Sequence, residues 1–368
     1  MKHRRTFTWM FLLIVTSALT GVQQRLDAEV NPSLETPVQP LPELLAAPEG
    51  ADGCGAEVVS ATDRVVAGPR PYSPEVASFA VRFKDEASPY RVMSLFALPG
   101  EEVAIEAVPG EGGGELTACA RGGELRRRDL ARSDGDGWTW RAPSRPGLYS
   151  LYVDDRSAGE TLKLNAFVMK PYRGEDRVND YRIGRYERVP LHGKAVYRVP
   201  RGMVEVTPDM LDVWLSPHFQ LRQFLCKQAS QYPKYLILSE RLLLKLETLL
   251  EKANDRGIEA DSFAVMSGFR TPHYNQSIGN RTSYSRHLYG DAADIYVDRD
   301  GDGRMDDLNG DGRSDAADAE LLARIVEESQ DEAWYRPFIG GLGLYGPAPH
   351  RGPFIHVDTR GFPARWSS

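Results

Sequence analysis

Apolar and polar positions follow a strand-like pattern between residues 56 and 172. Val103, Ile105 and Ala107 take every second position of one short run, and the same spacing returns at residues 149–153. This alternation is typical of strands with one buried face. Pro-Gly, Gly-Gly and Asp-Gly pairs separate the runs, as turns do. We therefore predict a small all-β sandwich of the immunoglobulin type for this part of the chain.

In the second half of the chain the spacing becomes helical. Ser239 offers an N-cap oxygen before a run of leucines, and Gly257 follows that run as a stop signal. The leucines recur at helical spacing and are expected to be buried: Leu242, Leu243, Leu246, Leu249 and Leu250. Ser216 offers the same kind of N-cap oxygen, and Pro217 suits the first position of a helix, so this pair predicts another helix start. A strand-like run, SFAVMS, comes next, so we expect residues 201–368 to form an α+β domain.

The N-terminus has the order of residues that is typical of an export signal. Basic residues at positions 2–5 precede an apolar run from Phe7 to Val22. That run is short for a membrane-spanning helix, which needs about 20 apolar residues, and an uncleaved anchor is the alternative. We predict a signal peptide or anchor at 1–28 and a Pro-rich linker at 29–55. The protein would then be periplasmic or in the cell envelope, either secreted or tethered to the membrane.

Charge and cysteine content narrow the class of protein. Lys and Arg number 45 against 52 Asp and Glu, for a formal net charge of -7. A general nucleic-acid binder presents a basic face, so that class is excluded. Three cysteines are too few for a disulfide framework, but an exported protein can hold one bridge. We favour Cys54–Cys119 because Cys226 falls in a predicted amphipathic helix, although three pairings are possible.

Candidate metal ligands gather in the stretch SRHLYGDAAD, where His287 and Asp294 stand seven positions apart around Gly290. Zinc sites that carry out chemistry commonly combine imidazole nitrogens with a carboxylate and leave a fourth position for water. Gly290 permits a tight turn, and the run after Asp294 predicts a strand that would hold its carboxylate. The strand-like run FIHVD offers His356 as a third ligand.

Two acidic loops follow within residues 298–318, and the first begins Asp-x-Asp-x-Asp-Gly at residues 298–303. The second resembles the calcium repeats of dockerins. It has oxygen donors at positions 1, 3, 5, 9 and 12 and glycine at position 6, as calcium loops do: Asp307, Asn309, Asp311, Asp315 and Asp318. Its last ligand is Asp rather than the Glu of an EF-hand. We predict a structural Ca²⁺ site in this insertion; a solvated acidic loop is the alternative.

Several motifs together resemble the zinc D-alanyl-D-alanine peptidases: SGFRTP, SRHLYGDAADI, GGLGLYG, FIHVDTRG and a late Trp366, in that family's order. The family includes carboxypeptidases and endopeptidases of bacterial cell walls and shares a fold with the hedgehog signalling domain. The resemblance covers residues 201–368, with residues 173–200 as a connecting segment. It implies a zinc DD-peptidase domain of α+β class that hydrolyses peptidoglycan stem peptides or crosslinks at D-Ala-D-Ala-type bonds.

The resemblance also implies roles for individual residues. His287, Asp294 and His356 would bind Zn²⁺, and bound water would reach a pKa of about 7. Arg270 would hold a peptide carboxylate or polarise the scissile carbonyl, with a structural salt bridge as the competing interpretation. Ser285 stands where the family places a serine that contacts substrate.

One position departs from the family pattern. Many relatives carry Glu or Asp, as the general base, three residues before the last histidine ligand, where this chain has Pro353. The candidates for the base are Asp358, which shares a strand face with His356, and His350 in a Pro-rich loop. Asp358 has an alternative role, which is to orient His356. The departure also leaves open a catalytically inactive, zinc-stabilised wall-binding protein, and another hydrolase or amidase on the same scaffold.

Overall fold

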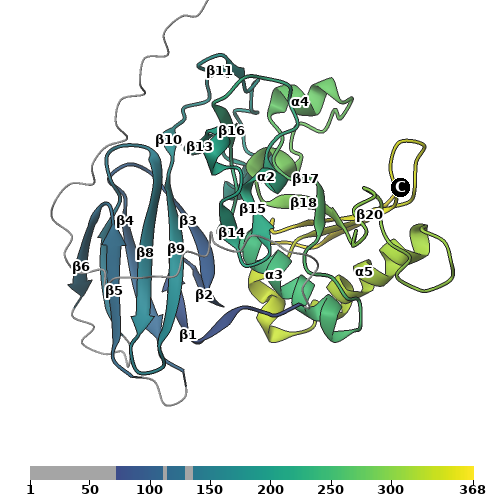
Figure 1. Cartoon of the computed structure of the whole chain (residues 1–368). Helices are drawn as coiled ribbons and strands as arrows, with labels where there is room; N and C mark the ends of the chain where they lie inside the picture. The colour runs from purple at the N-terminus through teal and green to yellow at the C-terminus, as the bar shows by residue number, and fades with distance from the viewer. Residues whose placement is uncertain (1–71, 111–113, 129–135) are drawn as a thin grey trace, which may run out of the picture. The chain divides into compact units, whose positions relative to one another are not determined.

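Strands form every regular element between residues 76 and 168 in the computed structural model, which describes residues 72–110, 114–128 and 136–368 (Figure 1). One sheet has the order β2-β1-β4-β7-β6: β2 (Glu86–Tyr90), β1 (Val76–Phe83), β4 (Glu102–Val108), β7 (Gly137–Arg141) and β6 (Glu124–Arg128). The other has the order β3-β9-β8-β5: β3 (Val92–Ala97), β9 (Glu160–Val168), β8 (Gly147–Asp155) and β5 (Leu116–Arg121).

The alternation predicted for β4 is confirmed. Val103, Ile105 and Ala107 are buried while their neighbours along the strand are more exposed. Val103 and Ile105 pair with Trp140 and Trp138 of β7. Both sheets contribute to one buried cluster. The sandwich arrangement and its immunoglobulin-like topology stay predictions.

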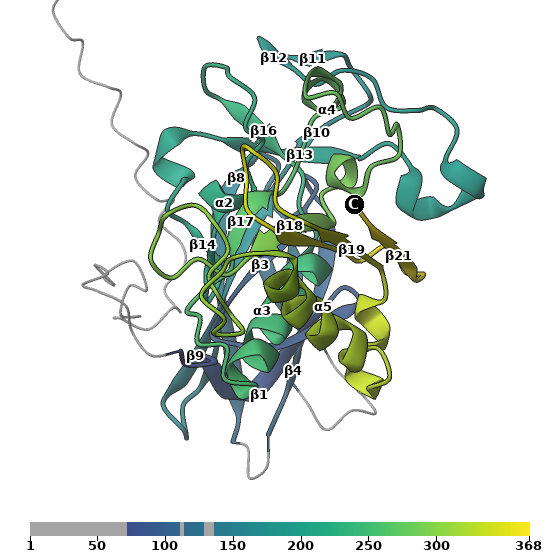
Figure 2. The same ribbon diagram turned by 90° about the vertical axis from the view of Figure 1, so that its right-hand side faces the viewer.

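A second mixed region contains the sheet that carries the predicted metal ligands. Its order is β17-β18-β20-β19-β21, antiparallel except for the β19–β21 pair: β17 (Ala264–Ser267), β18 (Ala292–Tyr296), β20 (Phe354–Asp358), β19 (Gly341–Tyr345) and β21 (Ala364–Ser367). Helix α5 (Ala316–Ser329) packs on β19 and β20, and α3 (Glu240–Asp255) packs beside α5 (Figure 2). Ile295 and Val357 are wholly buried in the core of this region.

The remaining elements are short, and three small sheets are made by β10 with β13 and β16, β11 with β12, and β14 with β15. Their strands are β10 (Lys170–Pro171), β11 (Arg177–Val178), β12 (Tyr181–Arg182), β13 (Gly202–Val206), β14 (Trp214–Ser216), β15 (Phe219–Gln220) and β16 (Lys234–Leu236). The short helices are η2 (Leu191–Gly193), η3 (Ala195–Tyr197), η4 (Pro208–Met210), α2 (Leu221–Phe224), α4 (Pro272–Ser277), η5 (Arg286–Tyr289) and η6 (Ala333–Phe338).

The leucine run forms helix α3 as predicted. Its five leucines at helical spacing are buried, and burying each stabilises the fold by about 1.5–3 kcal/mol. Gly257 follows with a φ of 79°, a conformation that favours glycine. Ser239 stands at the N-cap position, but its side chain accepts no cap hydrogen bond, so that detail of the prediction is wrong.

The helix start predicted at Ser216-Pro217 is also wrong. Ser216 ends strand β14, and the chain turns directly into β15. His218 lies in this turn, where its backbone amide and its ring Nδ1 both contact the carboxylate of Glu247 on helix α3. These polar groups of His218 therefore have partners without forming a helix.

The edge of β3 contacts residues of the C-terminal half. The Glu240 carboxylate, at the start of α3, accepts the amide hydrogen of Phe96 at 3.0 Å and pairs with Lys84 at 2.8 Å. Ser94 and Asn165 donate to the backbone carbonyls of Leu215 and Trp214, each at 2.8 Å. The bond to Glu240 satisfies the Phe96 amide, a backbone group on the edge strand β3 that would otherwise be open to pairing.

The described residues, 72–110, 114–128 and 136–368, accordingly belong to one compact unit. The predicted signal peptide or anchor at 1–28 and the linker at 29–55 lie outside the described residues. None of the described helices is both long and apolar enough to span a membrane. Cys119 is disulfide-bonded and Cys226 is a free, buried cysteine, whereas Cys54 lies outside the described residues. The prediction that Cys226 falls in an amphipathic helix is wrong, because helix α2 ends at Phe224.

A half-buried histidine and a buried glutamate join the turn after β14 to helix α3. His218 Nδ1 lies 2.6 Å from an oxygen of Glu247, whose other oxygen accepts the His218 amide hydrogen at 2.9 Å. Glu247 is fully buried. Burial by itself lowers the pKa of His218, but the hydrogen bond and the negative charge of Glu247 outweigh it and raise that pKa.

Because the pKa of His218 is raised in the folded protein, we predict that the stability of the fold depends on pH. A raised folded-state pKa stabilises the protein fully below the unfolded value of about 6.5, and the stabilisation is lost as pH rises through the folded-state value. The difference in Tm between the wild type and His218→Gln, measured with a chelator present, should be largest near pH 6 and shrink toward pH 9. His192→Asn is the control, because His192 is exposed. A difference that stays constant or grows with pH contradicts the account.

Candidate metal centre

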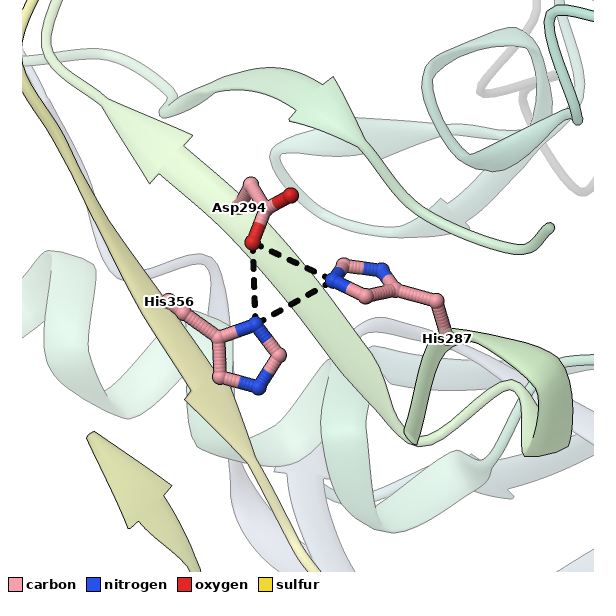
Figure 3. Close-up of side chains that lie close together, drawn as sticks. All are labelled: His287, Asp294 and His356. Atoms are coloured by element: carbon pink, nitrogen blue, oxygen red, sulfur yellow. Dashed lines mark hydrogen bonds and ion pairs between the residues drawn. The ribbon is translucent and has the colours of Figure 1, made fainter. Parts of the chain in front are cut away.

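The three predicted zinc ligands come together from three separate elements (Figure 3). His287 lies on η5, Asp294 on β18 and His356 on β20. His287 Nε2 is 3.1 Å from Asp294 Oδ1 and 3.1 Å from His356 Nδ1, and His356 Nδ1 is 2.9 Å from Asp294 Oδ1. One nitrogen of each ring and one carboxylate oxygen therefore face a common point.

Strand pairing places two of these side chains. Asp294 stands directly opposite His356 in the antiparallel β18–β20 ladder. Directly opposite residues project from the same face of a sheet, with Cβ atoms about 4.5–5.5 Å apart. Their neighbours Ile295 and Ile355 are also opposite each other and are wholly buried. The apolar neighbours thus fix which face carries the ligands.

Gly290 places the third ligand. It has a φ of 72° between η5 and β18, and a Cβ there would overlap the backbone carbonyl of Ile237. A larger residue would therefore be strained twice, by the left-handed backbone and by the missing space. The tight turn brings His287 back over Asp294.

The donor set fits zinc. Two imidazole nitrogens and one carboxylate oxygen are ligands that Zn²⁺ accepts at about 2.0–2.2 Å, so tetrahedral neighbours would lie about 3.3 Å apart. The observed separations of 2.9–3.1 Å are close to that spacing. All three residues are buried, with exposed fractions of 3%, 5% and 6% for His287, Asp294 and His356.

The outward-facing ring nitrogens have partners that set the orientation of each ring. His287 Nδ1 is 2.7 Å from the carbonyl oxygen of Gly268, to which it can only donate. This contact leaves Nε2 as the acceptor that faces the common point. His356 Nε2 is 3.1 Å from Asp358 Oδ2, which leaves Nδ1 to face that point. Metal-binding histidines are commonly held in this way.

The pKa shifts of the three candidate ligands bear on whether they can hold a cation. Burial lowers the pKa of His287 more than Asp294 raises it, which favours the neutral ring that a metal needs. Burial alone would raise the pKa of Asp294, but the contacts with His287 and His356 hold it well below its usual value. The pKa of His356 is raised, because hydrogen bonds to Asp294 and Asp358 outweigh burial. Metal binding would displace that proton.

Residues 217–308 match the family model of peptidase M15. The M15 family consists of zinc peptidases and includes D-Ala-D-Ala carboxypeptidases. The matched residues include His287 and Asp294 and end before His356. His356 is therefore joined to the M15-like site by its position opposite Asp294. A search of curated proteins found no match to this chain.

Asp358 does not have the surroundings of a general base. It is fully buried, and its Oδ2 faces His356 Nε2, on the side of the ring away from the common point. Its oxygens also accept hydrogen bonds from the Gly341 amide, the Arg360 amide and the Arg360 guanidinium. Burial would raise the pKa of Asp358, but His356 and Arg360 hold it far below its usual range. These contacts favour the alternative role, in which Asp358 orients His356.

Arg270 is in the M15-like site, but it contacts a ligand rather than open space. Its Nη2 lies 2.5 Å from Asp294 Oδ2, and its Nε donates to Ser267 Oγ at 2.7 Å. The guanidinium therefore holds the second oxygen of Asp294 while the first faces the common point. This is the salt-bridge interpretation, and the predicted contact with substrate would need the guanidinium to serve both partners.

The other predicted site residues, Ser285 and His350, make fewer contacts. Ser285 is half-buried at the start of η5, and its side chain makes no cap hydrogen bond. His350 is exposed in the loop between β19 and β20. Its ring has no hydrogen bond or ion pair within the described part of the chain. Of the two base candidates, Asp358 therefore has its carboxylate oxygens engaged, whereas the ring nitrogens of His350 have no partner among the described residues.

An aromatic contact beside His356 was not predicted. The Trp366 ring lies 5.1 Å from the His356 ring, and its Nε1 donates to Tyr345 Oη at 2.8 Å. Trp366 stands opposite Gly343 in the parallel β19–β21 pair, where a Cβ would overlap the indole. The alternating glycines of GGLGLYG are the sequence signal for this close packing.

Lys245 was also missed. It is fully buried on α3, where it donates to the carbonyl oxygens of Asp358 and Phe338 at 2.8 and 3.0 Å. Burial lowers its pKa to about 8. The sequence signal is a lysine inside the leucine run, at a position of the core face.

The acidic loops differ from the calcium prediction. In the second loop, Asp307 accepts three backbone amide hydrogens, and the buried Asp318 accepts three more while capping α5 with Asp315. Among the described residues, the acidic side chains that converge are in the first loop, where Asp306 joins Asp298 and Asp300 in place of Asp302. Calcium binding by Asp307, Asn309, Asp311, Asp315 and Asp318 stays a prediction.

The two roles of Asp358 are separable by experiment. If Asp358 orients His356, Asp358→Asn should weaken zinc affinity by about 10–100-fold, as loss of such partners does. Competition with a chromophoric zinc chelator measures this affinity. Asp155→Asn, at a buried carboxylate of β8, is the matched control and should keep wild-type affinity. Normal zinc affinity in Asp358→Asn, together with lost turnover, would instead identify Asp358 as the base.

Proposed function

We propose that this protein is an exported zinc metallopeptidase that hydrolyses peptidoglycan stem peptides or crosslinks at D-Ala-D-Ala-type bonds. The observation that carries the proposal is the convergence of His287, Asp294 and His356 on one point within 3.1 Å of one another. Three protein ligands of this kind leave a fourth position for water, as catalytic zinc sites do. The match to peptidase M15 supports a zinc peptidase in general.

The residues divide the work as follows. Zinc held by these residues would act as a Lewis acid and would lower the pKa of water to about 7. His287 and His356 present neutral nitrogens, and Asp294 presents a carboxylate whose second oxygen is held by Arg270. Asp358, fixed by Arg360, keeps Nδ1 of His356 toward Asp294 and His287, where the metal would be held.

None of the residues named so far is assigned to accept a proton from water. Pro353 has no acid to offer, and Asp358 faces away from the metal side of His356. His350 is the remaining candidate, because its ring is exposed and an imidazole nitrogen can accept a proton. We therefore assign proton transfer to His350 in this proposal.

A wall-binding protein without turnover is the second candidate. It is favoured by Pro353 and by the full set of hydrogen bonds on Asp358, which together leave the family's base position empty. In either case the partner would be peptidoglycan. The export signal and a periplasmic or envelope location, with or without a membrane tether, are part of the same proposal.

The test uses the full chain after export, loaded with zinc or treated with chelator, on purified peptidoglycan. Mass spectrometry of the muropeptides should show shortened or decrosslinked peptides only with zinc. His287→Ala should lower turnover by at least about 10³-fold, because the remaining two ligands cannot hold a reactive zinc. His192→Asn is the control and should keep full turnover.

Other outcomes separate the alternatives. Sedimentation with peptidoglycan without any new muropeptide identifies a binding protein. Release of intact stem peptides from the sugar identifies an amidase. Products that form equally with chelator present would refute a zinc mechanism.

A further inference from the structure

The segment that joins the β-rich region to the M15-like site is unusually basic. Residues 173–201 contain eight Lys or Arg against four Asp or Glu, in a chain whose formal net charge is -7. All eight cations are exposed: Arg173, Arg177, Arg182, Arg185, Arg188, Lys194, Arg198 and Arg201. We call residues 173–201 the basic segment.

Most of these charges have no acidic partner. Within the described residues, Arg182 is the member of the basic segment that forms an ion pair, at 3.7 Å from Asp176. Arg185, Arg188 and Arg198 form no side-chain hydrogen bond or ion pair in the same part of the chain. Their charges are free to meet an anion from outside.

The basic segment is bonded to the chain around the zinc ligand His287. Tyr186 donates to the carbonyl oxygen of Leu288 at 2.8 Å. Arg286 donates to the carbonyl oxygen of Val196 at 2.9 Å, and Tyr284 to that of Val189 at 2.7 Å. Residues on both sides of His287 therefore hold the segment in place.

The basic segment also contacts Phe362, which lies near the supports of His356. Lys194 Nζ lies 4.2 Å from the centre of the Phe362 ring, and the Arg360 guanidinium lies 5.8 Å from the same ring. Arg360 in turn pairs with Asp358, which holds His356. The basic segment thus contacts residues that flank His287 and, through Phe362, lies near Arg360, which pairs with the partner of His356.

We propose that the free cations of the basic segment form a binding surface for a carboxylate-rich peptide polymer beside the metal centre. This inference rests on the proposed function, since peptidoglycan peptides carry free carboxylates on either side of the bond to be cleaved. Arg side chains suit carboxylates because the guanidinium can donate two parallel hydrogen bonds. Unpaired surface cations of this kind also raise the rate of encounter with a polyanion.

The test compares two triple variants of the full chain with the same change in net charge. Arg185→Glu/Arg188→Glu/Arg198→Glu alters the basic segment, and Arg141→Glu/Arg145→Glu/Arg156→Glu alters exposed arginines of the β-rich region. The first should sediment with insoluble peptidoglycan about tenfold more weakly at low salt, from three exposed charge contacts. The second should stay within about twofold of the wild type because its charges lie elsewhere.

The ligand is tested by a second arm. Peptidoglycan whose carboxylates have been converted to amides should bind the wild type as weakly as native peptidoglycan binds the first variant. High salt should weaken wild-type binding as well, because exposed charges are screened. Equal binding of native and amidated material, or wild-type binding by the first variant, overturns the proposal. Salt-independent wild-type binding overturns it even if the variant fails to fold.

A small soluble muropeptide separates this inference from the proposed function. The first variant should cleave it at the wild-type rate, because the zinc ligands and their supports are unchanged. If the wild type cleaves no soluble muropeptide, the proposed function fails whatever the charge variants show. If soluble cleavage is normal and polymer binding ignores the charges, only the binding surface is wrong.

Discussion

The ligand geometry depends on the register between β18 and β20, which places Asp294 directly opposite His356. Side chains alternate between the two faces of a strand, so a slip of one residue would turn Asp294 into the core and Ile295 toward the metal side. The buried pair Ile295 and Ile355 opposes such a slip, because each would lose its apolar surroundings. Core packing on one face thus maintains the metal centre on the other.

A second layer of contacts holds the ligands in their orientations. Each ligand has a partner on the side away from the common point: the Gly268 carbonyl for His287, Arg270 for Asp294 and Asp358 for His356. Arg360 and the Gly341 amide then hold Asp358 itself. Because Asp358 is held in this way, it is not available as a base. The same contacts keep the ligands rigid and preformed, which a metal site needs for affinity.

The sequence predicted what local spacing and motif order encode. The buried leucines of α3, the alternation of β4 and the set of zinc ligands all follow from residue spacing or from the family resemblance. The misses concern long-range contacts. The hairpin at Ser216 follows from the bond between His218 and Glu247, 29 residues away. The role of Asp358 likewise depends on Gly341 in another strand, which spacing along the chain does not reveal.

The most direct test of the central claim is X-ray anomalous scattering at the zinc absorption edge, from crystals of the zinc-loaded protein. One strong peak is expected about 2.0–2.2 Å from His287 Nε2, His356 Nδ1 and an oxygen of Asp294. A zinc peak bound elsewhere, or no peak between these three side chains, would contradict it.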